Sequence, residues 1–129
     1  MAKENLTSKI IAEMACCNDL LETLYSLSQF DVEVFYCLEQ GKWKTVDEIA
    51  QLLGKDSSTV YRSLQKFMMN GLSIRNMQTI KGGGYFYQYA LTPVTTIQKS
   101  IQERIDCLKN GLEKLLGDLI QEIGSRNLQ

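Results

Sequence analysis

The sequence predicts a mostly α-helical chain with one small β-hairpin, an α+β arrangement, and three observations lead to this fold class. Apolar residues recur in steps of three and four near both ends of the chain, which is the repeat of an amphipathic helix. The middle holds clear helix start and stop signals. The stretch that follows alternates with a period of two beside a run of three glycines. At 129 residues, the length is that of a single domain, 1–129.

The two ends of the chain are predicted to be helical. Residues 1–28 are expected to hold one helix ending near Ser28, with apolar steps through Ile10, Met14, Cys17, Leu21 and Leu24. Residues 94–124 repeat these steps through Ile101, Ile105, Leu108, Leu112, Leu115 and Leu119. A helix of about thirty residues is roughly 45 Å long and cannot hide its apolar seam in so small a domain. We therefore expect that seam to contact a second copy of the chain.

Two shorter helices are predicted next, within residues 30–93. The first covers about residues 31–40 and stops at Gly41, a residue suited to the left-handed position after a helix. The second begins at Thr45 and ends at Gly54. Thr45 and Glu48 have the spacing of a capping box, in which the hydroxyl and the carboxylate each satisfy a backbone amide.

A third helix is predicted over residues 57–70, with Asp56 or Ser57 as its cap. Its apolar side holds Val60, Leu64, Phe67 and Met68. Its polar side holds Ser58, Arg62, Gln65 and Lys66, with Thr59 and Tyr61 at the margins. One face therefore suits the core and the other suits solvent or a ligand.

The hairpin is predicted over residues 72–91, with strands 72–79 and 85–91. In the second strand, three tyrosines alternate with other residues, which is the period of a strand. These are Tyr85, Tyr87 and Tyr89, which we expect to serve mainly in packing. Gly82–Gly84 form a flexible tip, and Pro93 marks the exit.

Charge is unevenly distributed, although the formal net charge is only −1. Residues 42–81 hold seven basic side chains against three acidic ones, whereas residues 1–41 hold two against seven. A local excess of basic charge indicates an anionic partner for the middle of the chain. The chain has no histidine, which removes the commonest general base and most zinc sites. We therefore expect no enzyme activity, no catalytic residue, no metal and no cofactor.

The four cysteines bear on the compartment. The N-terminus has no apolar run of signal-peptide length, and no later segment approaches a membrane span, so a cytoplasmic protein is expected. Disulfides are not expected there, and buried thiols are the ordinary interpretation of Cys16, Cys17, Cys37 and Cys107. The alternative is a redox or soft-metal sensor, because adjacent Cys16 and Cys17 would supply thiolates if exposed.

The predicted order of helix, short capped helix, tight turn, polar-faced helix and hairpin is the winged helix-turn-helix arrangement. In that fold, the third helix enters the major groove of DNA and the hairpin, or wing, lies along the backbone or minor groove. Arg62 suits a guanine edge and Gln65 an adenine, whereas Lys66 suits a phosphate. The hydroxyls of the first turn also suit phosphate oxygens, and the basic wing residues suit the backbone. The candidate DNA-binding residues are Ser57, Ser58, Thr59, Tyr61, Arg62, Gln65, Lys66, Arg75 and Lys81. For Tyr61, packing and DNA contact stay equally open.

From Phe30 to Pro93 the chain resembles the TrmB/MarR-like transcriptional regulators. The matching motifs are T-x-x-E-I-A at 45–50, Leu53-Gly54, S-T-V-Y-R-x-L at 58–64 and G-G-Y-x-Y at 83–87. The resemblance implies a homodimer that binds double-stranded DNA at an inverted repeat, with the helices outside the module making the dimer. Lys55 departs from the apolar residue of many relatives, and the chain is too short for the sugar-binding domain of full-length TrmB proteins.

Three alternatives stay open. The first is a winged helix that binds protein within the transcription machinery, which predicts little salt dependence, whereas phosphate contacts weaken steeply with salt. The second is a thiol- or metal-responsive form of the regulator. The third is an enzyme with a cysteine nucleophile, activated without histidine by a lysine or a helix N-terminus.

Overall fold

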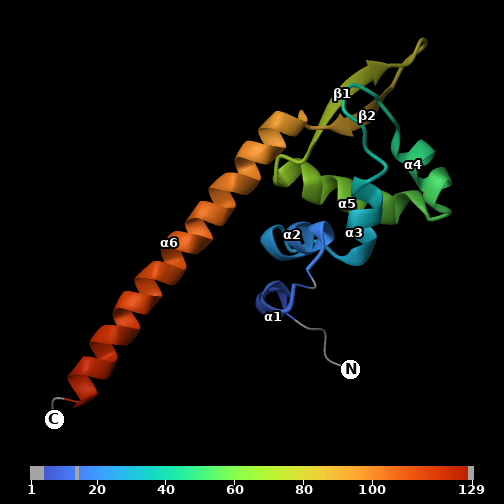
Figure 1. Cartoon of the computed structure of the whole chain (residues 1–129). Helices are drawn as coiled ribbons and strands as arrows, with labels where there is room; N and C mark the ends of the chain where they lie inside the picture. The colour runs from blue at the N-terminus through green and yellow to red at the C-terminus, as the bar shows by residue number, and fades with distance from the viewer. Residues whose placement is uncertain (1–4, 14, 128–129) are drawn as a thin grey trace. The chain divides into compact units, whose positions relative to one another are not determined.

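The computed structural model describes residues 5–13 and 15–127. The chain divides into two compact units, Met1–Ile97 and Gln98–Gln129. The elements, labelled in Figure 1, are α1 Leu6–Ile11, α2 Cys17–Leu24, α3 Gln29–Phe35, α4 Val46–Leu53, α5 Ser57–Met69, β1 Ser73–Thr79, β2 Tyr85–Leu91 and α6 Val94–Asn127. The predicted fold class, mostly helical with one antiparallel hairpin, is confirmed.

The prediction of a single N-terminal helix is wrong, because α1 and α2 are separate helices. Glu13 lies between them with a φ of 58°, in the left-handed region that a right-handed helix does not continue through. The chain then starts a new helix, and the Asp19 carboxylate accepts a hydrogen bond from the Cys16 amide at 2.9 Å. Met14, one of the predicted apolar steps, lies outside the described residues.

Helix α3 is shorter than the predicted helix over residues 31–40, and it ends at Phe35. Ser28 is its N-cap, and its hydroxyl accepts from the Asp31 amide at 3.0 Å. Gly41 does adopt a left-handed conformation, with a φ of 77°. It does so in a tight turn that pairs Glu39 with Lys42, and the prediction that it ends the helix is therefore wrong.

Helix α4 begins and ends as predicted. The Thr45 hydroxyl accepts from the Glu48 amide at 3.2 Å, and Gly54 takes the left-handed C-cap position with a φ of 63°. The reciprocal half of the predicted capping box differs, because the Glu48 carboxylate accepts from the Thr45 hydroxyl at 3.2 Å. Helix α5 follows within three residues, with Asp56 as its N-cap residue.

The wing is an antiparallel pair in which Ser73 lies opposite Leu91 and Thr79 lies opposite Tyr85. A short third segment joins it, because Lys44 and Tyr89 exchange backbone hydrogen bonds of 2.9 and 2.7 Å. The pairing attaches the segment before α4 directly to β2. Gly82–Gly84 all have positive φ, which explains why the tip consists of glycines.

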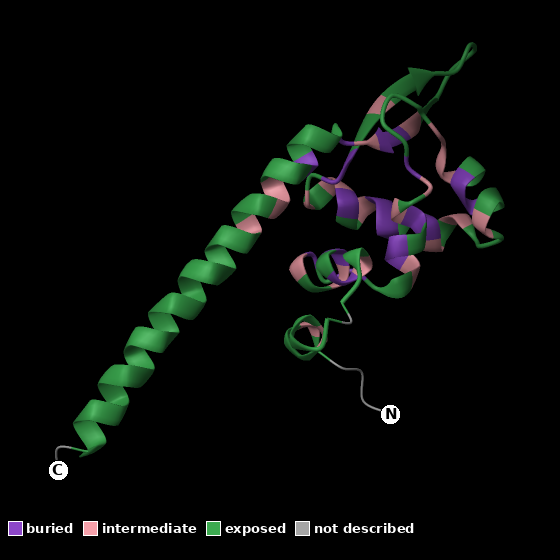
Figure 2. Cartoon of the chain, in the orientation of Figure 1, coloured by how far each residue is buried: buried purple, intermediate pink, exposed green. Residues whose placement is uncertain are grey.

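The core of the first unit lies among α3, α4, α5 and the base of the wing, where Figure 2 shows most of the buried residues. The predicted apolar face of α5 is confirmed, since Val60, Leu64 and Phe67 are fully buried and Met68 is half-buried. Burying each such side chain contributes about 1.5–3 kcal/mol. The largest fully buried side chains are Tyr89, Phe67, Ile49, Leu64, Leu72, Val34 and Val60. This packing directs the opposite face of α5 toward solvent.

The predicted long C-terminal helix is present as α6, with 34 residues. Beyond Ile97 its apolar side chains are exposed or half-buried, as Figure 2 shows. The exposed ones include predicted seam residues and three that the periodicity did not single out, namely Leu116, Ile120 and Ile123. The apolar face of α6 is therefore broader than predicted near its C-terminus. In the described ranges, no helix is both long enough and apolar enough to cross a membrane.

Candidate nucleic-acid interface

The polar face of α5 lies open along its length. Ser58, Tyr61, Arg62 and Lys66 are exposed, and Ser57, Thr59 and Gln65 are half-buried. The helical repeat explains this division, because Ser58, Arg62 and Gln65 lie on the side away from buried Val60, Leu64 and Phe67. Lys66 lies beside this polar side, and Ser57, Thr59 and Tyr61 lie at the margins of the apolar face.

The first turn of α5 differs from the expected cluster of free hydroxyls. The Ser57 hydroxyl donates to the Asp47 carboxylate at 2.5 Å, and the Thr59 hydroxyl donates to the carboxylate of Asp56. Asp56 is therefore engaged with a hydroxyl and makes no side-chain cap to the helix. Two of the three predicted phosphate-binding hydroxyls thus already have carboxylate partners, which leaves Ser58 as the stronger candidate.

Arg62 lies at the rim of a shallow hollow between α4 and α5. The hollow is lined by Val46, Asp47, Ser57, Ser58, Tyr61 and Arg62. Tyr61 is 46% exposed, so its ring is accessible to a ligand. Arg62 is exposed as well, and its guanidinium has five donors in a fixed fork. Arg62, Tyr61 and Ser58 can donate hydrogen bonds from this hollow to base edges or phosphates, whereas Asp47 is an acidic member of the lining that already accepts from Ser57.

Lys66, predicted to meet phosphate, forms an ion pair within the protein. Its Nζ lies 2.8 Å from Asp31 Oδ2, while 51% of its side chain stays exposed. The partner, Asp31, is a buried carboxylate in the first turn of α3. It also accepts hydrogen bonds from the Ser63 hydroxyl at 2.6 Å and the Ser28 amide at 2.9 Å.

Asp31 is a site residue that the sequence analysis missed. Burial alone would raise the pKa of Asp31, but the hydrogen bonds from Lys66, Ser63 and Ser28 outweigh it and lower the pKa below its ordinary value. The carboxylate therefore stays charged. The available sequence signal was the spacing of Ser28 and Asp31, which is that of a capping box. No sequence pattern indicated that Ser63 and Lys66 would meet it.

The wing carries an aromatic and cationic face. The Arg75 guanidinium lies 4.0 Å from the ring centre of Tyr87, and the Tyr85 and Tyr87 rings meet edge to face at 5.6 Å. Tyr85 is 60% exposed, whereas Tyr89 is fully buried. Tyr89 therefore packs in the core as expected, and Tyr85 and Tyr87 pack against each other on the surface of the wing. Lys81 is exposed at the tip.

A further charge signal runs through α5 and the wing. From Ser57 to Gln102 the chain contains no aspartate or glutamate, although that run holds five basic residues. They are Arg62, Lys66, Arg75, Lys81 and Lys99. The net charge of −1 for the whole chain does not reveal this basic stretch, because the acidic residues lie elsewhere in the sequence. An acid-free basic segment favours an anionic partner at α5 and the wing.

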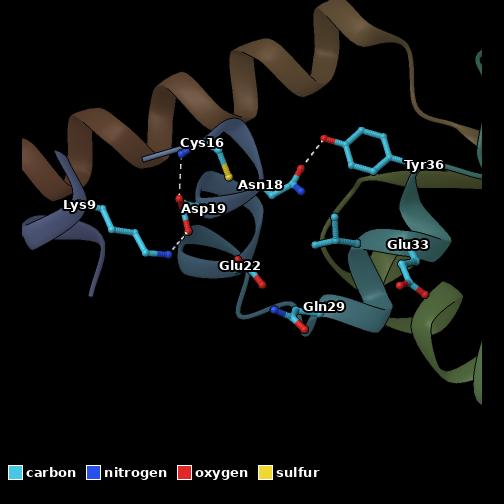
Figure 3. Close-up of a pocket in the computed structure, with 9 residues that line it drawn as sticks. Lys9, Cys16, Asn18, Asp19, Glu22, Gln29, Glu33 and Tyr36 are labelled. Carbon is cyan, nitrogen blue, oxygen red and sulfur yellow. Dashed lines mark hydrogen bonds and ion pairs between the residues drawn. The ribbon is translucent and has the colours of Figure 1, made fainter. Parts of the chain in front are cut away.

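A separate open pocket of about 400 Å³ lies among α1, α2 and α3, and Figure 3 shows residues that line it. On one side Lys9 pairs with Asp19 at 2.8 Å, and on the other the Tyr36 hydroxyl donates to Asn18 Oδ1 at 2.7 Å. Burial, together with the nearby Cys17 thiol, raises the pKa of Tyr36. Asp19 has a lowered pKa because Lys9 and the Cys16 amide donate to it.

The expectation of buried thiols is wrong for Cys16, Cys17 and Cys107, which are exposed, and Cys37 is half-buried. The reason for the first two is that they lie at the exposed start of α2, after the break that periodicity did not reveal. The Cys17 sulfur lies 3.8 Å from the Tyr36 hydroxyl. Among the described residues, no group of three cysteines and carboxylates is arranged to hold a metal ion.

Helices α3, α4 and α5 with the hairpin β1–β2 define a winged helix-turn-helix protein. The family model described as "Sugar-specific transcriptional regulator TrmB" matches residues 21–95, more than half of the chain. The chain belongs to the TrmB family. The resemblance to TrmB/MarR-like regulators is thereby confirmed, and the protein is a transcriptional regulator of the winged-helix type rather than an enzyme.

Relatives of this chain have similar length. The uncharacterized protein MJ1503 of Methanocaldococcus jannaschii is 28% identical over 116 residues, which cover 87% of this chain and 88% of that protein. A possible transcriptional regulator from Methanosarcina mazei Go1 has a TM-score of 0.75 at 27% identity, covering 78% of this chain and 86% of that one. The S. aureus MepR protein, in a complex with DNA, has a TM-score of 0.52 at 21% identity, covering 90% and 99%. That last likeness shows the fold alone.

Proposed function

We propose that this protein is a sequence-specific DNA-binding regulator that acts as a homodimer on an inverted-repeat site. Helix α5 enters the major groove, and the wing follows the backbone or the minor groove. The observation that carries the proposal is the open polar face of α5, with exposed Arg62 at its centre, inside a segment free of acidic residues. The complex of MepR with DNA supports it, because a protein of this fold binds DNA.

The proposal gives each candidate residue a role. Arg62 reads a base edge, since a guanidinium can bridge O6 and N7 of guanine. Gln65 pairs with adenine, and Tyr61 borders the same contact. The first turn, mainly through Ser58, meets phosphate, as do Arg75 and Lys81 from the wing. Ser57 and Thr59 lie in the same first turn and contribute by their position there. Their hydroxyls already donate to carboxylates within the protein.

Lys66 keeps a role toward phosphate in this proposal. Its ammonium has three donors, and the ion pair with Asp31 uses one of them. About half of the side chain stays exposed, so the other two donors face solvent or a ligand. In this proposal, Lys66 contacts the DNA phosphate while its ion pair with Asp31 fixes the position of its ammonium group.

The dimer is proposed to form through α6. Its apolar side chains from Ile105 to Ile123 are exposed in the single chain, and an exposed apolar face of this length favours a partner helix. A two-fold dimer places two α5 helices about 34 Å apart, one turn of DNA. This spacing is the reason for expecting an inverted repeat.

Selection of bound fragments from random duplex DNA tests the proposal. The expected result is enrichment of an inverted repeat whose half-sites are about one helical turn apart, with affinity that falls steeply as salt rises. The same protein applied to fragments with one half-site scrambled should bind more weakly. Recovery of fragments with no common sequence, at any salt concentration, would overturn the proposal.

A second candidate function is binding to protein, and one observation favours it. The wing exposes Met77, Tyr85 and Phe86, which are apolar or aromatic side chains of the kind enriched at protein interfaces. This function predicts no sequence enrichment and binding that changes little with salt. The selection experiment therefore separates the two candidates.

A further inference from the structure

Asp31 connects α3 to the proposed recognition helix at two points. Its Oδ1 accepts from the Ser63 hydroxyl at 2.6 Å, and its Oδ2 accepts from the Lys66 ammonium at 2.8 Å. Ser63 and Lys66 are three residues apart, so they lie on one side of α5, almost one turn from each other. Two anchors on one side of a helix restrict its rotation about its own axis.

The carboxylate is itself held by its own helix. The Ser28 amide donates to Oδ2 at 2.9 Å, and the Ser28 hydroxyl accepts from the Asp31 amide at 3.0 Å. This capping box begins α3, whose core residues Val32 and Val34 are buried. The anchor for α5 is therefore a buried side chain of a capped first turn, although Ser28 and Gln29 of that turn are exposed.

We propose that Asp31 is a positioning residue for sequence reading. It holds α5 at the rotation that presents Arg62 to a base edge, and it holds the Lys66 ammonium beside the DNA backbone. Arg62 precedes Lys66 by four residues, so any rotation of α5 that breaks the ion pair also moves Arg62. Hydrogen bonds to an ionised group are roughly twice as strong as neutral ones, so the charge of Asp31 matters as well as its shape. The proposal rests on the proposed function, because it assumes that α5 reads DNA.

Asp19 provides a matched control within the same chain. It is also a buried carboxylate, and it accepts from the Cys16 amide at 2.9 Å and from the Lys9 ammonium at 2.8 Å. The exposed fraction of its side chain is 8%, against 4% for Asp31. The difference is the partner, since Lys9 belongs to α1 and Lys66 belongs to α5. Both carboxylates pair with a lysine and a backbone amide, but only Asp31 also accepts from a serine hydroxyl, and only Asp31 contacts the recognition helix.

The test compares Asp31→Asn and Asp19→Asn in the full chain. Affinities for the selected inverted repeat and for random duplex DNA are measured on protein shown to be folded by circular dichroism. Asp31→Asn should weaken operator binding by about tenfold and leave random-DNA binding within about twofold, because the general phosphate attraction does not need an exact rotation of α5. Asp19→Asn should leave both affinities within about twofold, although it also removes a buried charge.

A double-mutant cycle identifies the route of the effect. If Asp31 acts through Lys66, Asp31→Asn should lower operator affinity less in a Lys66→Met protein than in the wild type. Should Asp31→Asn fail to fold, Ser63→Ala removes only the hydroxyl anchor, and it should reduce the ratio of operator to random affinity about threefold.

Two results would overturn the proposal. One is an unchanged ratio of operator to random affinity in folded Asp31→Asn, or in Ser63→Ala if the first variant does not fold. The other is an equal loss of that ratio in Asp19→Asn. Failure of the proposed function itself is recognised separately, because the wild-type protein would then show no operator preference at all.

Discussion

At the scale of single residues, Arg62 is the side chain on which sequence reading by α5 depends most. It is exposed at the rim of the hollow between α4 and α5, and the described structure gives it no ion-pair partner. Lys66, one turn later, forms an ion pair with Asp31. The two basic residues of this face are therefore expected to behave differently when they are replaced.

We expect Arg62→Ala to lower operator affinity by about 1 to 3 kcal/mol and to relax the preference at one base pair of each half-site. The affinity for random duplex DNA should fall less, because there the substitution removes only an attraction to phosphate. Lys99→Ala, which removes the same charge from α6, serves as the control and should leave the preference unchanged. Equal losses on operator and random DNA for Arg62→Ala would contradict base reading.

The thiols should differ in their reactivity. Cys16 and Cys17 are exposed, whereas burial raises the pKa of half-buried Cys37, and the thiolate is the form that reacts. Brief treatment of the native protein with iodoacetamide should label Cys16 and Cys17 before Cys37, as peptide mass spectrometry would show. In urea the difference should disappear. Faster labelling of Cys37 in the native protein would contradict the observed burial.

At the scale of elements, the sequence predicted the middle of the chain better than its N-terminal part. The signals at Thr45 and Gly54 are local: a hydroxyl that caps an amide and a glycine in the left-handed region depend on neighbouring atoms. The periodicity of residues 10–24 is a different kind of signal. It continues across the break between α1 and α2 at Glu13, and of its described members only Leu21 is buried.

Of the residues at the two ends of α4, we expect Gly54 to be the most sensitive to substitution. Its φ of 63° is strained for any residue with a Cβ, so Gly54→Ala should lower the free energy of unfolding by about 1 to 2 kcal/mol. Gly124→Ala is the control, because Gly124 lies in α6 with open space around it and has no left-handed φ. Alanine favours the helix there by about 1 kcal/mol. Urea denaturation of both variants measures the difference, and a stabilised Gly54→Ala would contradict the assignment.

At the scale of the whole molecule, acid should destabilise the fold through its buried carboxylates. The pKa values of Asp19 and Asp31 are lowered in the folded protein. Their contribution is therefore complete above the ordinary carboxyl pKa of about 4 and is lost as pH falls below it, through the folded-state values. The free energy of unfolding in urea should be level near neutral pH and should decline below about pH 4.

Asp31→Asn provides the check on this pH dependence. The variant should be less stable at pH 7 and should lose less stability between pH 5 and pH 3 than the wild type, since one of the responsible groups is missing. Identical slopes for the two proteins over that range would show that Asp31 does not contribute to the acid sensitivity.

The assembly should depend on the apolar face of α6. Leu112→Asp places a charge in the middle of that face, where burial against a partner helix would be costly, and it should convert the dimer to a monomer. Light scattering at micromolar concentration measures the mass. Asn110→Asp, an exposed position on the side of α6 opposite Leu112, is the matched control and should leave the dimer intact. A wild-type protein that is already monomeric would contradict the proposed dimer.

The amino-acid sequence alone determined the order of the elements from α3 onward, the wing with its glycine tip and the buried side of α5. These properties follow from short-range chemistry and from helical and strand periods, which neighbouring residues specify. The family was indicated separately, by the resemblance of the motifs between Phe30 and Pro93. Only the tertiary structure decided which polar groups meet. Asp31 and Lys66 are 35 residues apart, and Lys44 and Tyr89 are separated by 45 residues, so no local pattern predicts either contact. The role of the buried Asp31 carboxylate could be recognised only from the tertiary structure, because the packing of α3 against α5 brings Ser63 and Lys66 to Asp31.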